Sequence, residues 1–230
     1  MLNLACIRHH KLETVPYAWA VINGLFTPQD AAALAATYPC DHFKRVAQND
    51  AQRVYDYEAR ALIGMGANTI TNPDDLSDAW RALALDFLSP QYKATMTALT
   101  GRNLNNVPME VNVFHYGPGA NLDAHRDLPE KLVTHVLYFN RSWNAGDGGC
   151  LRILRSSDQA DLMAEIPPII GCSCVIVRSE NSWHAVSRVA GGSPLSRRSV
   201  TVTFYRPGSV STMWPPSDKT PLHRYPAAEE

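Results

Sequence analysis

The chain has little of what marks a membrane protein, a secreted protein or a nucleic-acid-binding protein. No apolar run approaches the roughly 18 residues that a membrane span needs, and the first residues carry charge without the apolar stretch of a secretory signal. The net charge is -1, and the 21 basic residues are scattered rather than grouped. We therefore expect a cytoplasmic protein that has neither a membrane nor a nucleic acid as its partner.

Cysteine is also too sparse to form a structural framework. The count is five, which is odd, and no two cysteines stand in a CxxC motif. This pattern supports neither a structural zinc site nor a disulfide scaffold. We expect reduced thiols packed in the protein, at Cys6, Cys40, Cys150, Cys172 and Cys174.

What the chain does have is enough apolar residues for one sizeable core. It holds 230 residues, 45% of them hydrophobic, and a single domain is the default at this length. Residues 1–106 are predicted to be mostly helical. Thr27-Pro28 and Ser89-Pro90 each offer an N-cap followed by proline at the first helical position. They predict helices running towards Tyr38 and Gly101, and a further helix is predicted at about 75–88.

The predicted secondary structure changes from helices to strands after residue 106. Short segments rich in β-branched and aromatic residues, bounded by Gly, Pro, Asn or Asp, predict strands at 107–116, 132–140, 149–154, 173–178 and 197–205. Strands at such spacing are typical of a sandwich or barrel, and helices followed by strands indicate an α+β fold with segregated layers. The proline-rich segment 207–230 is predicted to be an extended tail over the surface.

The first chemical motif is His125-Arg126-Asp127. Residues two apart in an extended segment point the same way, so the imidazole and the carboxylate can meet one ion. Alone this pattern is weak, because an HxD triplet is common by chance. His184 follows a later predicted strand. Two histidines and one carboxylate form the facial triad of non-haem iron(II) oxygenases, which leaves coordination positions open for a bidentate co-substrate and oxygen.

The last predicted strand carries the second motif. Period-two alternation places Arg197, Ser199 and Thr201 on one face and Arg198 and Val200 on the other. An arginine that faces a barrel interior is costly unless it is paired. A dicarboxylate co-substrate would supply the partner, because a guanidinium group matches a carboxylate bidentately.

With these motifs in place, residues 111–205 resemble the 2-oxoglutarate/iron(II) dioxygenase superfamily, and within it the prolyl-hydroxylase-like branch. The resemblance lies in the order and spacing of several motifs rather than in any one of them. They are Tyr116-Gly-Pro-Gly, His125-x-Asp127, the run 133–140, Trp143, Gly148-Gly149-x-Leu151, Trp183-His184 and Arg197-x-Ser199. Arg197 comes later after His184 than in the closest prolyl-hydroxylase pattern, but the strand phase and the R-x-S pattern both favour Arg197 over Arg198.

The resemblance implies a role for each matching residue. His125, Asp127 and His184 match the catalytic iron ligands. Arg197 matches the residue that binds the distal carboxylate of 2-oxoglutarate, and Ser199, Tyr138 and Tyr116 match other residues around this co-substrate. The implied fold is a double-stranded β-helix, a jelly-roll relative, over 107–206. The N-terminal helices would pack on one of its sheets and contribute a lid.

The implied activity is an oxygenase that uses Fe(II), 2-oxoglutarate and O2 and releases succinate and CO2. The preferred substrate is a small molecule, such as an amino acid or a natural-product intermediate, because the chain shows no added recognition domain. One alternative is a hydroxylase of prolyl or other residues in a protein or peptide. A second is a non-catalytic, metal-binding jelly-roll protein. The protein is expected to be a monomer or a homodimer, and the sequence leaves the substrate and the oxidised position open.

Overall fold

The computed structural model describes residues 1–49, 54–192 and 196–225. The helices are α1 (Leu4–Arg8), α2 (Pro28–Ala36), α3 (Asp78–Leu88) and α4 (Pro90–Thr100), with short 3-10 turns at Pro73–Asp75 and Ala145–Asp147. The strands are β1 (Trp19–Asn23), β2 (Lys44–Asn49), β3 (Val54–Ile63), β4 (Met109–Tyr116), β5 (Asn121–His125), β6 (Lys131–Tyr138), β7 (Leu151–Leu154), β8 (Leu162–Ile166), β9 (Cys172–Val177), β10 (His184–Val186) and β11 (Arg197–Tyr205).

Local capping chemistry defines the three longer helices. The side chains of Thr27, Ser77 and Ser89 each accept a hydrogen bond from a backbone N–H in the first turn of α2, α3 and α4. Proline holds the first position of α2 and α4, and Gly101 ends α4 in the left-handed conformation. The three helices predicted from the sequence are confirmed, with α3 beginning at Asp78 after its cap at Ser77.

The strands form one antiparallel sheet that folds over into a nearly closed jelly roll. Its order is β1-β9-β6-β11-β4-β3-β5-β10-β7-β8, with β2 paired to β3. β3 joins the two halves, because it pairs with β4 along one part of its length and with β5 along another. The predicted double-stranded β-helix is confirmed, and so are all five predicted strands, within two residues at each end. The first hundred residues contribute β1, β2 and β3 as well as helices.

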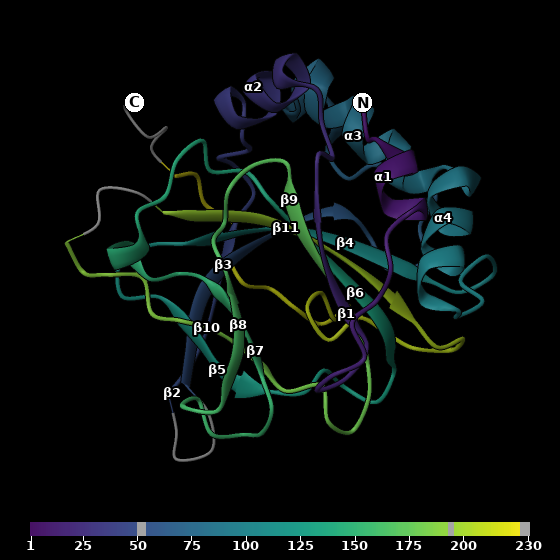
Figure 1. Cartoon of the computed structure of the whole chain (residues 1–230). Helices are drawn as coiled ribbons and strands as arrows, with labels where there is room; N and C mark the ends of the chain where they lie inside the picture. The colour runs from purple at the N-terminus through teal and green to yellow at the C-terminus, as the bar shows by residue number, and fades with distance from the viewer. Residues whose placement is uncertain (50–53, 193–195, 226–230) are drawn as a thin grey trace.

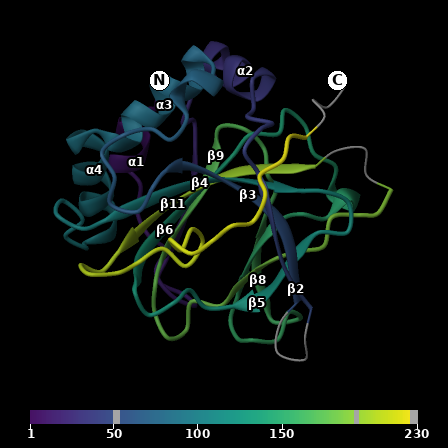
Figure 2. The same ribbon diagram turned by 180° about the vertical axis from the view of Figure 1, so that it is seen from behind.

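Two apolar clusters lie on opposite faces of the larger half-sheet. Val200, Val202 and Phe204 of β11 point outward and pack under α3 and α4, where Trp80 and Tyr92 are fully buried. Figures 1 and 2 show the helices gathered over this face of the sheet. The second cluster lies on the inner face and includes Tyr116 and Tyr138 of this half together with Ile153 of β7 in the other half. The alternation of β11 thus directs Arg197, Ser199 and Thr201 into the barrel.

The segment after β11 returns across the barrel as an extended strap, which we define as residues 207–225. Ser211 donates to a carboxylate oxygen of the buried Glu110 at 2.5 Å, and Trp214 Nε1 donates to Asn112 Oδ1 at 2.7 Å. Lys44 of β2 holds it from the other side, through the carbonyl of Met213 and the carboxylate of Asp218. Figure 2 shows the strap in yellow, running past β3. In the described part of the chain, no helix is long and apolar enough to cross a membrane.

Candidate active site

The two candidate histidine ligands face each other across a strand pair. β5 and β10 are antiparallel neighbours, and their register sets His125 directly opposite His184. The ring centroids lie 4.2 Å apart. Nδ1 of His125 lies 2.9 Å from the carbonyl oxygen of Asp123, and Nδ1 of His184 lies 2.9 Å from that of Ser182. A carbonyl only accepts, so Nδ1 carries a proton in each ring, and Nε2 is the nitrogen that each ring can offer to a metal.

Asp127 completes the group from the loop that follows β5. One ligand atom from each of His125, Asp127 and His184 lies within 4.8 Å of the others, as a shared metal ion requires. The Asp127 side chain is buried, and its two oxygens accept hydrogen bonds from Lys131 Nζ at 2.6 Å and from Thr134 Oγ1 at 2.7 Å. Burial would raise the pKa of this carboxyl, but the charges of Lys131 and the two histidines hold the pKa below its ordinary value.

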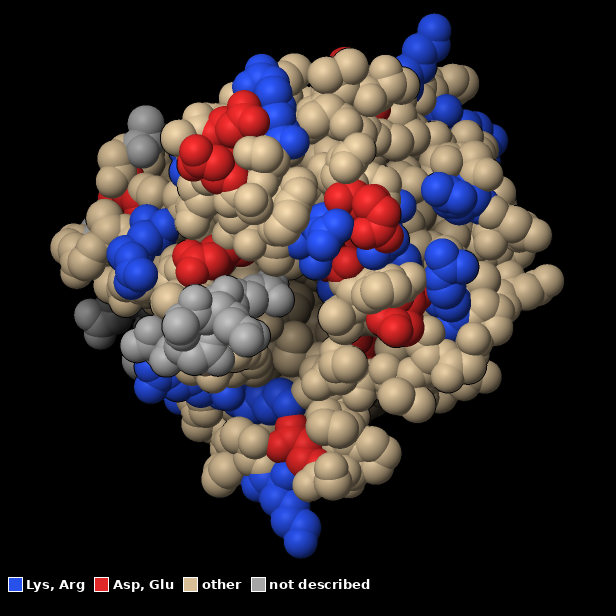
Figure 3. Space-filling view, turned by 90° about the horizontal axis from the view of Figure 1, so that it is seen from below, with Lys and Arg blue, Asp and Glu red and all other residues tan. Residues whose placement is uncertain are grey.

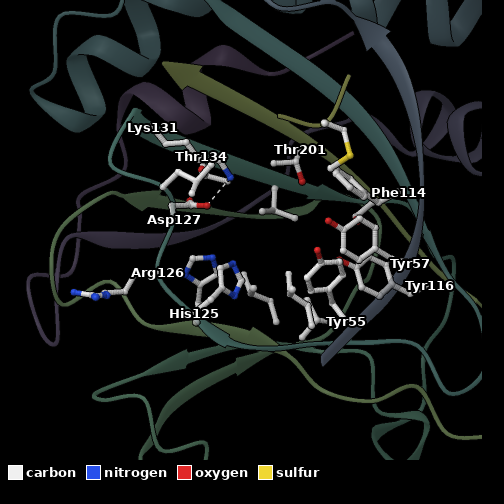
Figure 4. Close-up of a pocket in the computed structure, with 18 of the residues that line it drawn as sticks. Tyr55, Tyr57, Phe114, Tyr116, His125, Arg126, Asp127, Lys131, Thr134 and Thr201 are labelled. Carbon is white, nitrogen blue, oxygen red and sulfur yellow. Dashed lines mark hydrogen bonds and ion pairs between the residues drawn. The ribbon is translucent and has the colours of Figure 1, made fainter. Parts of the chain in front are cut away.

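These three residues line a cavity of about 240 Å³ inside the barrel. Figure 4 shows His125 and Asp127 on one side of it, and Tyr55, Tyr57 and Tyr116 on the other. The view in Figure 3 shows this end of the molecule hollowed near its centre, with acidic and basic side chains close together beside the hollow. The strap supplies part of the cavity wall through Thr212 and Met213.

Arg197 also lines the cavity and is only 2% exposed. Its guanidinium carbon lies 4.8 Å from the ring centroid of Tyr116 and 5.4 Å from that of Tyr138. Nη1 donates to Ser199 Oγ at 2.7 Å, while Nε has no hydrogen-bond partner among the described residues. No carboxylate in the described part of the chain forms an ion pair with this guanidinium, so its charge is buried without an anion.

The surroundings of Arg197 offer further hydrogen-bond donors. The hydroxyl of Tyr138 is fully buried and has no partner among the described residues, and burial raises its pKa well above the ordinary value. Tyr116 stacks on Tyr57 with ring centroids 5.3 Å apart. The arrangement forms a pocket end that presents positive charge and hydroxyl groups but no acid, which suits a carboxylate.

The donor set fits a divalent transition metal and would leave some of its coordination positions open. Two imidazole nitrogens and one carboxylate oxygen are the ligand types of the facial triad, and the orientation of both rings is fixed by the backbone hydrogen bonds of Nδ1. The buried, unpaired guanidinium in the same cavity fits a dianionic co-substrate. Six of the seven residues singled out from the sequence line this cavity, and the seventh, Tyr138, lies beside Arg197, whose guanidinium carbon is 5.4 Å from its ring centroid.

Sequence reasoning missed four contributors to this site. Lys131 and Thr134 hold the carboxylate of Asp127, and Thr134 shares the inner face of β6 with Val136 and Tyr138, so alternation alone indicates its direction. Tyr55 and Tyr57 form the opposite wall from β3. Their spacing of two residues indicates that both rings point to the same face of a strand. No pattern in the sequence indicates that β3 pairs with β5, which is what brings this face to the cavity.

Comparisons with known proteins agree with this geometry. Residues 111–206 match the family model of the 2OG-Fe(II) oxygenase superfamily. The fold resembles a prolyl-4-hydroxylase from Pseudomonas putida (21% identity, 88% of this chain and 99% of that one, TM-score 0.58). It also resembles an oxidoreductase of the 2OG-Fe(II) oxygenase family from Burkholderia pseudomallei (15% identity, 90% and 93%, TM-score 0.60).

A third solved structure with this fold is a non-haem, alpha-ketoglutarate-dependent epimerase of nogalamycin biosynthesis (15% identity, 96% and 91%, TM-score 0.51). No curated protein sequence gives a significant match. The superfamily resemblance read from the sequence is confirmed, and the superfamily implies Fe(II), 2-oxoglutarate and O2.

Proposed function

We propose that this protein is an Fe(II)- and 2-oxoglutarate-dependent oxygenase that hydroxylates a small molecule and releases succinate and CO2. His125, Asp127 and His184 are the proposed iron ligands, and Arg197, Ser199, Tyr138 and Tyr116 the proposed co-substrate residues. The observation that carries the proposal is the presence, in one small cavity, of a His-Asp-His donor set and a buried guanidinium without an anion.

The residues of the chain have separable tasks in this reaction. Iron and 2-oxoglutarate supply the oxidising chemistry when they are bound, and the protein supplies position and exclusion of water. Arg197 anchors the distal carboxylate of the co-substrate through charge-assisted hydrogen bonds, with Ser199 holding the guanidinium in place. The apolar lining at Leu151 and Val186 keeps water from the reacting atoms.

Charge and volume support a small substrate. The cavity is below the roughly 300–1,000 Å³ of sites that enclose drug-sized ligands, and it has to hold the co-substrate as well. Its lining carries Arg197 and Lys131 against the single acid Asp127, while Arg126 is already paired with Glu180 at 3.0 Å. These two basic groups favour a substrate with its own carboxylate, such as a free amino acid, over an internal peptide residue, which has none.

The activity test is succinate formation. Protein with confirmed Fe(II) is incubated with 2-oxoglutarate, oxygen and a panel of amino acids and natural-product acids, and succinate is quantified. We expect release above background with at least one free acid, and loss of release in His184→Ala. The same panel offered as N-acetyl amides and as proline-containing peptides separates the substrate classes. Turnover of peptides alone would establish the peptide hydroxylase alternative, and no succinate from any substrate would contradict the enzyme assignment.

A further inference from the structure

Both oxygens of the Asp127 carboxylate are already occupied by donors from β6. Lys131 Nζ lies 2.6 Å from Oδ1, and Thr134 Oγ1 lies 2.7 Å from Oδ2. Figure 4 shows Lys131 and Thr134 together above Asp127, away from the tyrosine wall. A metal ion at the three clustered ligands needs a lone pair from one of these oxygens. One of the two donors must therefore share its oxygen or leave it when a metal binds.

The two donors differ in how easily they leave. Thr134 is buried within β6, its side chain is β-branched and stiff at χ1, and its hydroxyl is neutral. Lys131 stands at the first position of β6, and its side chain is 22% exposed on a flexible four-carbon stem. Its ammonium group also repels a divalent cation bound to the same carboxylate, and this repulsion is strong in a poorly solvated site.

We propose that Lys131 is an internal counter-ion of the metal-free site, and that it gives up Asp127 when a divalent metal binds while Thr134 keeps it. This inference rests on the metal site of the proposed function. In the metal-free protein the ammonium group neutralises a carboxylate that is otherwise buried beside two imidazoles. In the metal-bound protein the metal supplies that charge. Because Lys131 lines the cavity, its ammonium group then turns towards the bound small molecules.

Cobalt(II) titration tests this without any turnover. Affinity and the visible absorption of bound Co(II) are measured for wild type, Lys131→Met, Lys131→Arg, Thr134→Val and Thr134→Ser. We expect Lys131→Met to bind Co(II) at least about tenfold more tightly, because the repulsion is gone, and Lys131→Arg to stay near wild type. Thr134→Val should bind about 10- to 100-fold more weakly, and Thr134→Ser should restore the affinity.

Thermal unfolding gives a second readout and reports whether each variant folds. Without metal, Lys131→Met should melt below wild type, because Asp127 loses its counter-ion. With saturating Co(II), the order should reverse. Lys93→Met is the matched control, since it removes one positive charge on α4, which packs on the outer face of the sheet. It should change neither the Co(II) affinity nor the order of melting.

The outcomes separate this inference from the proposed function. If wild type does not bind Co(II), the metal site and the oxygenase assignment both fail. If wild type binds Co(II) but Lys131→Met binds it equally or more weakly, Lys131 is a retained partner of Asp127, and the displacement is refuted. If Thr134→Val binds as wild type does, the role of Thr134 is refuted.

Discussion

Replacement of Arg197 by methionine should weaken 2-oxoglutarate binding without lowering the stability of the folded protein. Arg197 is 2% exposed, and its guanidinium has no acidic partner in the described residues, so the co-substrate carboxylate would be its only anion. Removal of one member of a buried charge pair costs about 3 to 5 kcal/mol. This corresponds to a dissociation constant about a hundredfold to several thousandfold higher. Methionine keeps most of the apolar contact with Tyr116 and Tyr138.

The stability of the co-substrate-free protein should move the other way. A buried charge with no partner is unfavourable, so Arg197→Met should melt at or above the wild-type temperature when no 2-oxoglutarate is present. Saturating 2-oxoglutarate should then raise the melting temperature of wild type much more than that of the variant. The two opposite signs distinguish a co-substrate residue from one that simply supports the fold.

The assay is calorimetric titration of Mn(II)-loaded protein with 2-oxoglutarate without oxygen, together with thermal unfolding. Arg198→Met is the matched control, because Arg198 is adjacent in β11 but lies on the outer face, over the ring of Tyr38. It should change the affinity by less than twofold. Binding by Arg197→Met within fivefold of wild type, or equal loss in both variants, would refute the assignment of Arg197.

Three more expectations follow from individual contacts. His184→Ala should weaken Co(II) binding at least a hundredfold while exposed His10→Ala does not, and equal binding in both would contradict the triad. Burial lowers the pKa of His135 from 6.5 to about 3, so the unfolded chain binds the extra proton between these values. Stability should fall by about 2 kcal/mol from pH 6.5 to pH 5 on this account. Urea unfolding should show that part of the pH dependence missing in His135→Gln. Gly148→Ala should cost about 2 to 4 kcal/mol in urea unfolding, because its Cβ would lie 1.9 Å from the carbonyl oxygen of Arg188 at a φ of +65°. Gly146→Ala, with nothing within 4 Å, should cost far less.

Those parts of the fold that depend on local chemistry could be predicted from the sequence. Helix caps at Thr27 and Ser89 and the alternation of β11 act over a few residues, so a short window contains the whole signal. The inward direction of Arg197 followed from that alternation. The same alternation places His135 out of phase with Tyr138, and in the structure it contacts Tyr92 of α4 through a 2.9 Å hydrogen bond, away from the barrel interior.

The rest of the site depends on pairings between distant segments. β5 and β10 have five and three residues, too few for a periodic signal, yet their register is what sets His125 against His184. The two ends of β3 pair with different strands, β5 at one end and β4 at the other, and no local pattern in β3 indicates this division. Lys131 and Thr134 approach Asp127 because the chain turns back after β5. How closely β6 then passes Asp127 is set by the assembled barrel.

The strap contributes to the shape of the cavity but supplies none of the proposed metal or co-substrate residues. Every residue assigned to iron or to 2-oxoglutarate precedes residue 206, so a chain cut after Tyr205 would retain all of them and still lose the wall at Thr212 and Met213. Lys44, from the N-terminal part, keeps that wall in place through Met213 and Asp218 and lies 4.2 Å from the centroid of the Trp214 ring. A change at the contact between Lys44 and the strap should therefore reshape the cavity wall while it leaves the proposed metal ligands and Arg197 in place.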